Sequence, residues 1–524
     1  MNEHVAINIR EVLDYALENN GKINDSIRLP YFKMVDEFYA AEEDHNVWNK
    51  AGKFLPMGDS LYDFIENSYN YGLFPSDYHY DYLKDLKNKL QTDTLSRKDA
   101  IVWTKIDLML TDGFLRIIQD LKHGRLGPDS LYPKTEAFLS NDFSIKTLKE
   151  VIYNRKLVPV LNDMEPNNKA YVAMRMALPD FLDSIDKTPY TYIEYPWKDS
   201  LEMLKGLQQR LEEENFSDGT VSFEDSAKFS RIIKKAQRKK GLTVDGKVTG
   251  SLVKRLNTRW TDYFKKIALN LDRYKQMPSP MPEKYIWVNL PGFYLRVFEK
   301  DSMILESKVI VGKPTTPTPL LSSTLSNMVT YPQWTIPASI IKKEVLPGLK
   351  KDPGYLSRKG YMLVNDKGDE VDAYKVKWSK YHDDIPSKVV QGSGDENALG
   401  VFKFNFYSPF DVYLHDTNQR YLFKNKTRAL SHGCVRVQDW EKLESYITYN
   451  DSLSSTKSRP VSYNSDSIKT WLEKKMKKII YVRTRLPIYI RYITCEANPA
   501  GSIVFYDDIY GLDKASENKL GKKG

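Results

Sequence analysis

The hydrophobic period of the sequence changes once, and the change divides the chain into a helical part and a β-rich part. Before the proline-rich stretch MPSPMPE (277–283), apolar residues recur at spacings of three and four, and after it they alternate. The first spacing indicates amphipathic helices, and the second indicates strands with one buried face. Three prolines cannot continue the preceding helical pattern WTDYFKKIALNLDRYKQ, so a domain boundary is expected there. The fold class predicted is a multidomain α+β protein.

The helical part itself divides in two. Within residues 1–198 the clearest pattern runs from Ile106 to Leu121, with Gly124 just past its end. A second unit, residues 199–258, begins with LEMLKGLQQRLEEENF. It continues through AQRKKGLTVDGKV, in which a glycine ends the helix and Asp-Gly makes a turn, and it closes with LVKRLN. The first of these helices is expected to bury one face, made by Leu201, Leu204, Leu207 and Leu211. Three helices in about sixty residues leave too little core for an active site, so we expect a binding or spacer role.

Alternation in the second part predicts a β-meander that opens at Ile286. Residues 338–395 interrupt it with a charged, lysine-rich, partly helical insertion, which suggests a lid or specificity loop. Strands are then expected at VFKFNF, DVYLHD, IIYVRTRLPIYIRYI and SIVFYDDIY. The last residues, KASENKLGKKG, are expected to be a solvated tail.

Composition excludes several classes of protein. The 41% hydrophobic and 12% aromatic content of the 524 residues is enough for real cores and excludes a mostly disordered chain. Two cysteines exclude a disulfide-stapled scaffold and any four-cysteine metal site. The opening residues lack a signal-peptide pattern, so the protein is either cytosolic or exported by a signal outside the given sequence. The net charge of +9 is spread along the chain, which fits an ordinary surface or an acidic partner.

The reactive residue types meet in one window, residues 411–440, which contains His415, His432 and Cys434. A cysteine nucleophile reacts as its thiolate, which a neighbouring imidazole supplies by taking the proton. The glycine before Cys434 lets backbone N–H groups converge on an oxyanion. A Cys/His acyl-transfer site is therefore predicted. The alternatives are a buried structural cysteine, a metal site completed by Asp416, and a disulfide to Cys495.

This window resembles the catalytic domain of the YkuD-type L,D-transpeptidases, whose pattern is a histidine, 14 to 17 residues and then Ser/Thr-His-Gly-Cys. Here 15 residues separate His415 from Ser431, and SHGCVRV follows in full. VNLPGFYLRVF, SKVIVGKPTTPTPLLSS, PQWTIP, LKKDPGYLSRKGY, ALGVFKFNF and YDDIYGLD are similar to the large, multidomain YcbB-like branch of that family.

The resemblance implies a domain order that covers nearly the whole chain. It consists of a helical scaffold domain (1–198), a small three-helix peptidoglycan-binding-like module (199–258), a scaffold return helix with the Pro-rich linker (259–282), a β-rich catalytic domain (283–513) with a lid or capping insertion (338–395), and a flexible tail (514–524). The small module departs from its family pattern, because Ala236 replaces the usual aromatic residue and Thr249 the usual glycine. The fold of this module is implied, whereas glycan binding is not.

The resemblance also implies a role for each site residue. Cys434 is the nucleophile, His415 is the general base and acid, and the backbone N–H groups of Gly433 and Cys434 form the oxyanion hole. Asp416 orients His415 through its carbonyl or its side chain, and His432 shapes the site. Three further residues are candidates for substrate binding: Arg436, which anchors its loop or meets a substrate carboxylate, and Tyr413 and Trp334, which line the site or belong to the core.

The function implied is the formation of 3–3 peptidoglycan crosslinks through a cysteine thioester, with release of D-alanine from tetrapeptide stems. Its substrates are a donor stem peptide and an acceptor amine, its covalent inhibitors are carbapenem-type β-lactams, and it requires no cofactor and no metal. Location in the periplasm or cell envelope and partnership with other cell-wall synthesis enzymes follow, and nucleic acid is not expected. Two alternatives are an L,D-carboxypeptidase or hydrolase of the same fold, and a non-catalytic peptidoglycan-binding scaffold.

Overall fold

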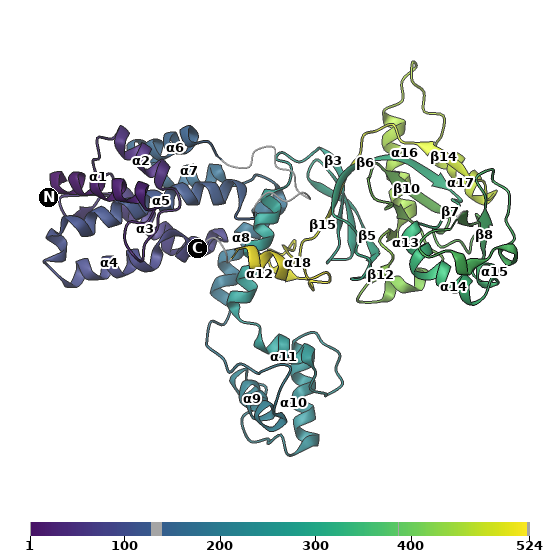
Figure 1. Cartoon of the computed structure of the whole chain (residues 1–524), viewed down its shortest axis with the longest axis horizontal. Coiled ribbons are helices and arrows are strands. Elements are labelled where there is room, and N and C mark those ends of the chain that lie inside the picture. Colours follow the sequence, from purple (N-terminus) through teal and green to yellow (C-terminus); the bar gives the residue numbers. More distant parts are fainter. Residues whose placement is uncertain (1, 127–138, 386, 521–524) are drawn as a thin grey trace.

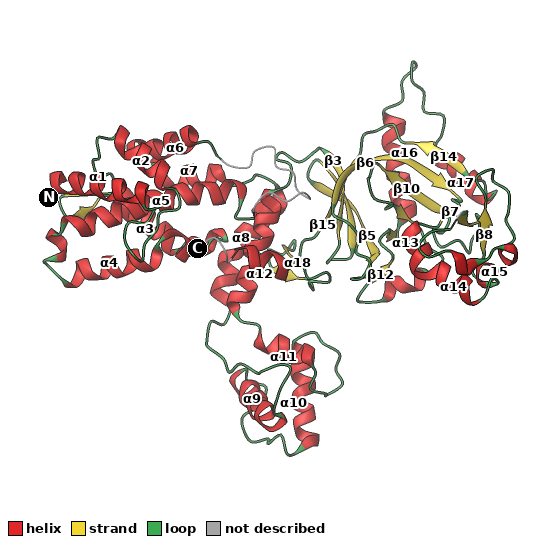
Figure 2. Cartoon of the chain, in the orientation of Figure 1, coloured by secondary structure: helices red, strands yellow, loops and turns green. Residues whose placement is uncertain are grey.

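The computed structural model describes residues 2–126, 139–385 and 387–520. A helical domain occupies one end of the elongated molecule and a β-rich domain the other, and a small three-helix unit projects from between them (Figure 1). Figure 2 shows that the strands gather almost entirely in the β-rich domain. Within the described ranges, no helix has the length and apolar content needed to cross a membrane.

The helical domain is built around one long central helix, α5 (Ala100–His123). Asp99 caps its start by accepting the N–H of Ile101, and Gly124 follows its end with a φ of +74°, as the sequence predicts. The buried side of α5 is packed by the other helices and by a two-stranded hairpin. These elements are α1 (Asn2–Glu18), α2 (Phe32–Ala41), β1 (Asn49–Lys50), β2 (Lys53–Phe54), α3 (Pro56–Glu66), α4 (Tyr80–Thr92), α6 (Asn141–Asn154) and α7 (Leu157–Met164). The next helix, α8 (Lys169–Ser184), packs into a different hydrophobic cluster, which it shares with the β-rich domain.

The small unit has its own hydrophobic cluster, formed by α9 (Ser200–Glu213), α10 (Ser226–Lys239) and α11 (Gly250–Asn257). One part of its predicted face is wrong. Leu207 is fully buried, but Leu201 is 52% exposed and Met203 is buried in its place. At 100° per residue, Leu201 lies about 120° around the helix from Leu207, whereas Met203 lies only about 40° away.

The β-rich domain opens with the predicted meander, in which three strands pair antiparallel. These are β3 (Lys284–Asn289), β4 (Tyr294–Glu299) and β5 (Ser302–Gly312). From β5 the sheet continues through β13 (Val435–Val437), β11 (Leu414–His415) and β10 (Phe402–Phe406). From β3 it continues through β15 (Pro487–Arg491), β6 (Leu321–Thr330) and β14 (Lys478–Tyr481). Because β6 also pairs with β10, the sheet closes on itself.

Strand β6 is absent from the sequence-based expectations. Its residues LSSTLSNMVT are mostly polar, so they lack the alternation that identifies a half-buried strand. In the structure this strand supplies Leu325 and Met328 to the core and holds β15 on one side and β10 on the other.

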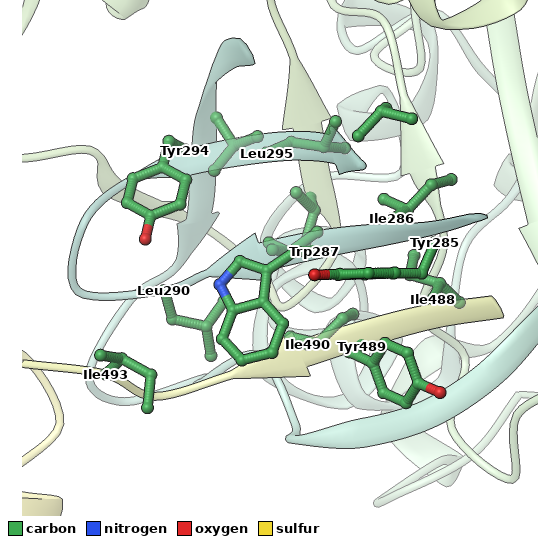
Figure 3. Close-up of a cluster of buried hydrophobic side chains, with 14 of the residues drawn as sticks. Tyr285, Ile286, Trp287, Leu290, Tyr294, Leu295, Ile488, Tyr489, Ile490 and Ile493 are labelled. Carbon is green, nitrogen blue, oxygen red and sulfur yellow. The ribbon is translucent and has the colours of Figure 1, made fainter. Parts of the chain in front are cut away.

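The core of the β-rich domain is shared with the helical domain. Figure 3 shows Tyr285 and Trp287 of β3 beside Tyr489 of β15, whose ring meets that of Tyr285 at 5.9 Å between centroids. The same cluster takes in side chains from α8 and from α12 (Trp260–Lys275). The predicted return helix is therefore part of the core of the β-rich domain as well as of the helical domain.

The predicted flexible tail at 514–524 is partly wrong. Helix α18 (Leu512–Leu520) occupies its first part, and residues 521–524 lie outside the described ranges. The helix is fixed through Asp513, which is 4% exposed and accepts hydrogen bonds from Arg273 of α12 at 2.6 Å and from Thr494 at 2.7 Å. The pattern of the tail did not reveal this anchor, because the contact partners are distant in sequence.

The predicted insertion at 338–395 is a compact unit with its own hydrophobic cluster. Its small sheet has the order β7 (Trp334–Thr335), β9 (Lys388–Gln391), β8 (Tyr361–Val364). Three short helices, α13 (Ala338–Ile340), α14 (Leu346–Lys351) and α15 (Tyr355–Arg358), and a π-helical turn, η4 (Ile341–Val345), pack beside it. Since β7 pairs with β9, the unit begins at Trp334, four residues before the predicted boundary. Two further helices, α16 (Trp440–Leu453) and α17 (Ser465–Glu473), and the strand pair β16 (Cys495–Ala497) and β17 (Ile503–Phe505) complete the domain.

Candidate active site

The register of two parallel strands brings the predicted nucleophile and base to one face of the sheet. In β11 and β13, Leu414 pairs with Val435, and both side chains are fully buried in the core. Side chains alternate along a strand, so their neighbours face the opposite side. His415 and Cys434 therefore project from the same face. The N–H of Val435 donates to the carbonyl of Tyr413 at 3.1 Å, and this hydrogen bond extends the pairing to the residues just before Leu414 and Val435.

Strand β10 adds a lysine to this face. Lys403 pairs with His415 across the antiparallel ladder, and its ammonium lies 3.6 Å from the ring centroid of Tyr413. The sequence carried a signal for it, because VFKFNF alternates and places Lys403 on the face opposite the buried phenylalanines. Lys403 is a site residue that the sequence analysis missed.

Cys434 is a free, half-buried thiol just before β13. Its sulfur lies 3.6 Å from the carbonyl oxygen of Asp411 and also interacts with the backbone and hydroxyl of Tyr413. Burial raises the pKa of this thiol, while hydrogen bonds from Tyr413 and the charges of Lys403 and Arg436 act in the opposite direction. Cys495 is also free and fully buried, so the disulfide alternative is wrong.

His415 is a buried, neutral imidazole. Its Nδ1–H donates to the backbone carbonyl of Asp416 at 2.5 Å, so the lone pair is on Nε2. Burial lowers the pKa of His415 to about 3, and the charges of Arg436 and Lys403 add to this effect. With the pKa of Cys434 raised, the resting pair is a neutral thiol beside a neutral imidazole. The sequence-based picture of a sulfur anion held by its histidine therefore describes a reacting state and not the resting one.

Asp416 orients His415 through its backbone, which decides between the two predicted modes. Its carboxylate is occupied elsewhere, by the guanidinium of Arg420 at 3.0 Å and by the N–H of Val401 at 3.0 Å. Gly400, with a φ of +63°, lies so close that an added Cβ would stand 2.3 Å from the Asp416 carboxylate. Arg420 and Gly400 are supporting residues that no sequence pattern indicated.

The predicted oxyanion hole needs a correction. The N–H of Gly433 donates to Ser431 Oγ at 3.1 Å, and that hydroxyl in turn donates to the carbonyl of Cys434 at 2.6 Å. Because the Gly433 N–H is already engaged, the Cys434 N–H is the donor of this loop that remains for an oxyanion, and no described residue accepts from it. Gly433 still has a purely conformational role, since its φ of +128° is closed to L side chains. Thr318 Oγ1 holds its carbonyl at 2.7 Å.

Three predicted substrate-binding residues border the same face. Arg436 donates to Gln419 at 2.9 Å, which is the loop-anchoring alternative, and its buried Nε has no partner among the described residues. Tyr413 packs edge-on against His415 with 5.7 Å between ring centroids. Trp334, from the inserted unit, hydrogen-bonds to the side chain of Tyr413.

His432 points away from Cys434 and toward the inserted unit. Its Nε2 lies 2.6 Å from the carboxylate of Glu344, on the π-helical turn η4. A cavity of about 170 Å³ at this contact is lined by both residues and by Lys313 and Lys343. The inserted unit therefore meets the site at two points, through Trp334 and through Glu344. Over the described part of the chain, no group of three or more His, Cys, Asp or Glu side chains could hold a metal ion.

A cysteine and a neutral histidine on one face of a closed sheet are the arrangement of a Cys/His acyl-transfer enzyme. Residues 283–461 match the family model of the L,D-transpeptidase catalytic domain, and residues 33–178 match the model of a scaffold domain. Residues 283–461 are therefore a YkuD-type L,D-transpeptidase catalytic domain, which confirms the resemblance and the combination of a helical scaffold with a β-rich catalytic domain.

A curated relative from Haemophilus influenzae, whose name assigns it to the L,D-transpeptidases, is 35% identical over 249 residues. The match covers 48% of this chain and 48% of the relative, so the chain spans about half the length of that protein.

Two solved structures are also similar. An L,D-transpeptidase from Mycobacterium smegmatis is 13% identical over 40% of this chain and 58% of its own, with a TM-score of 0.19. The catalytic domain of an Enterococcus faecium L,D-transpeptidase acylated by ertapenem is 13% identical over 40% of this chain and 98% of its own, with a TM-score of 0.16. Likeness at these TM-scores carries no argument about this chain.

Proposed function

We propose that this protein forms 3–3 crosslinks in peptidoglycan. The sulfur of Cys434 attacks the carbonyl carbon that joins the diamino acid of a tetrapeptide stem to its terminal D-alanine. The C–N bond breaks, D-alanine leaves as its amine, and the stem stays on the enzyme as a thioester. The side-chain amine of a second stem then attacks the thioester, the C–S bond breaks, and the thiol is regenerated.

The observation that carries this proposal is the shared sheet face of Cys434 and His415, with the His415 ring held by the backbone carbonyl of Asp416. In the first step His415 takes the thiol proton and passes it to the leaving amine. An imidazolium whose pKa is held near 3 by burial and two cations is a strong acid, which favours transfer to the amine. In the second step the neutral imidazole takes a proton from the attacking amine.

Capture by an amine in place of water requires a site that excludes solvent. The inserted unit is our candidate for this role, because Trp334 reaches Tyr413 and Glu344 reaches His432 across the mouth of the site. Deleting 338–395 is expected to raise hydrolysis relative to crosslinking. Glu344→Gln tests the same contact with less disturbance, and an unchanged ratio of the two products in both variants would reject the lid role.

The direct test is incubation of the purified protein with a disaccharide-tetrapeptide, followed by mass spectrometry of the products. A crosslinked dimer with free D-alanine supports the proposal. Tripeptide alone supports the hydrolase alternative, and no product that depends on Cys434 supports a binding scaffold. Cys434→Ala is the matched control for each outcome.

Covalent inhibition is a second consequence of a reactive Cys434. A carbapenem carries a strained amide that a thiolate can open, so intact-mass spectrometry should show one adduct on the wild type. The Enterococcus faecium catalytic domain named above was solved with ertapenem attached. The same adduct on Cys434→Ala, or none on the wild type, would contradict this assignment.

The proposed substrate determines the proposed location. Peptidoglycan lies outside the cytoplasmic membrane, so we propose that the protein works in the periplasm or cell envelope, beside other cell-wall synthesis enzymes. Protease treatment of spheroplasts tests the location, since an exported protein is digested while a cytosolic marker survives. In-cell crosslinking followed by mass spectrometry tests the partners.

A further inference from the structure

Lys403 is a half-buried cation at the edge of the thiol site, and the nearest acidic side chain that acts on it electrostatically, Asp411, does not form an ion pair with it. It lies half-buried in the middle of β10, and its aliphatic stem is flanked by strands on both sides. Its ammonium lies over the ring of Tyr413 at 3.6 Å. Among the described residues that ammonium makes no hydrogen bond and no ion pair. A half-buried ammonium supported by an aromatic face alone is costly unless it serves an anion.

The charged and titratable groups around Cys434 come from four segments. β10 contributes Lys403, the segment before β11 contributes Asp411 and Tyr413, β11 contributes His415, and β13 contributes Arg436. His432, although next to the cysteine loop, is turned toward Glu344.

Two of the three basic groups are not available to a sulfur anion. Arg436 is committed to the 417–419 loop through Thr417 and Gln419. His415 is neutral at rest, because a proton on its ring would meet the charges of both Lys403 and Arg436. Arg436 and Lys403 are both coupled electrostatically to Cys434, in both directions, but Lys403 is the one of the two whose donors are not held by a described residue.

We propose that Lys403 is the counter-ion of the Cys434 thiolate. It is a positioning residue that acts on the nucleophile through charge, while His415 only carries the proton. When the thiol gives up its proton, the sulfur anion forms near an ammonium that is already in place, so no charge has to be brought in during the reaction. The inference deepens the proposed function, but it concerns the reactivity of the thiol itself and can be tested without peptidoglycan.

The test is the rate of Cys434 alkylation by iodoacetamide as a function of pH, followed by peptide mass spectrometry. Lys403→Gln is expected to raise the apparent pKa of Cys434 by about one unit, and so to slow alkylation near pH 7.5 about tenfold. Lys403→Arg keeps the charge and should restore most of the rate. Lys308→Gln is the matched control, since Lys308 is an exposed lysine on β5 of the same sheet.

The outcomes separate the role from its rivals. An unchanged pH profile in Lys403→Gln overturns the proposal, and so does a variant that only raises the KM for tetrapeptide, which would indicate a substrate carboxylate as the partner. A misfolded variant is recognised because buried Cys495 then becomes alkylated. If the wild type shows the Lys403-dependent profile but does not turn over tetrapeptide, the proposed function fails and this inference stands.

Discussion

The two cysteines of this chain lie in the same domain, in regions that make opposite use of the same thiol. Cys434 stands half-buried just before β13, coupled electrostatically to Lys403, a lysine that forms no ion pair within the described residues. Cys495 is fully buried in β16, where Lys266 and Arg273 are both nearby.

Each of the cations near Cys495 faces an acid, because Asp513 lies 2.6 Å from Arg273 and 3.7 Å from Lys266. Burial raises the pKa of both thiols, so burial does not explain the difference. What separates the two thiols is the partial exposure of Cys434 and a neighbouring cation that is not tied up in an ion pair.

The largest expected effect comes from removing the sulfur of Cys434. Cys434→Ala should lower thioester formation and crosslinking by at least about 10³-fold, because no other group on that face can form the acyl bond. Cys495→Ala should leave both rates within about twofold. Intact-mass spectrometry after acylation measures the first effect, and steady-state product formation measures both. Loss of activity in Cys495→Ala with an unchanged melting temperature would contradict a purely structural role for Cys495.

Removing the base should separate the chemistry of Cys434 from its reactivity. His415→Gln is expected to lower acylation by the stem peptide by about 10²- to 10⁴-fold, since the leaving amine loses its proton donor. Alkylation by iodoacetamide should fall far less, because that reagent needs no proton from the enzyme. Parallel rate measurements with both reagents check this, and an equal loss in both would mean that His415 sets the thiolate population.

The neutral state of His415 should also appear in the pH dependence of stability. Its folded pKa, about 3, lies below the unfolded value of about 6.5, so the unfolded chain binds a proton that the native protein refuses. The contribution of neutral His415 to the free energy of unfolding is complete above about pH 6.5 and is lost as the pH falls toward 3. At pH 4 the loss is on the order of 3 kcal/mol.

Urea unfolding of the wild type and His415→Gln at several pH values measures this loss as a difference. Asp107 opposes it, because burial raises the pKa of that carboxyl to about 6, but Asp107 is present in both proteins and cancels. A wild-type and variant difference that does not change between pH 7 and 4 would contradict a neutral, buried His415.

The smallest effect is expected at Cys495 itself. Cys495→Ser should cost about 1 to 3 kcal/mol of unfolding free energy, because a hydroxyl is harder to bury than a thiol. The polar groups nearby, Lys266 and Arg273, already pair with Asp513. The carbonyl of Lys266, 3.7 Å from the sulfur, is the one acceptor within reach. Thermal melting measures the cost, with Cys434→Ser as the matched control at the half-buried site, where a smaller change is expected.

Much of this arrangement could be predicted from the sequence. The change of hydrophobic period separated the helical part from the β-rich part, and the His–15–Ser-His-Gly-Cys spacing picked out His415 and Cys434, which the fold places on one face of the sheet, because both are local patterns. What escaped depends on contacts between distant segments. β6 is mostly polar and is recognised as a strand only by its pairing with β10 and β15, and α18 depends on Arg273 and Thr494, far from it in sequence. The engagement of the Gly433 N–H follows from a single hydroxyl rotamer, which no residue pattern encodes.

The position of β15 determines when the sheet can close during synthesis of the chain. This strand lies between β3 and β6, although almost 200 residues of chain separate it from β3. A ribosome delivers the nucleophile loop well before residues 487–491, so the sheet that presents the thiol stays open until nearly all of the polypeptide has been synthesised. Placing the closing strand late in the gene delays the appearance of a reactive thiol until the chain is almost complete.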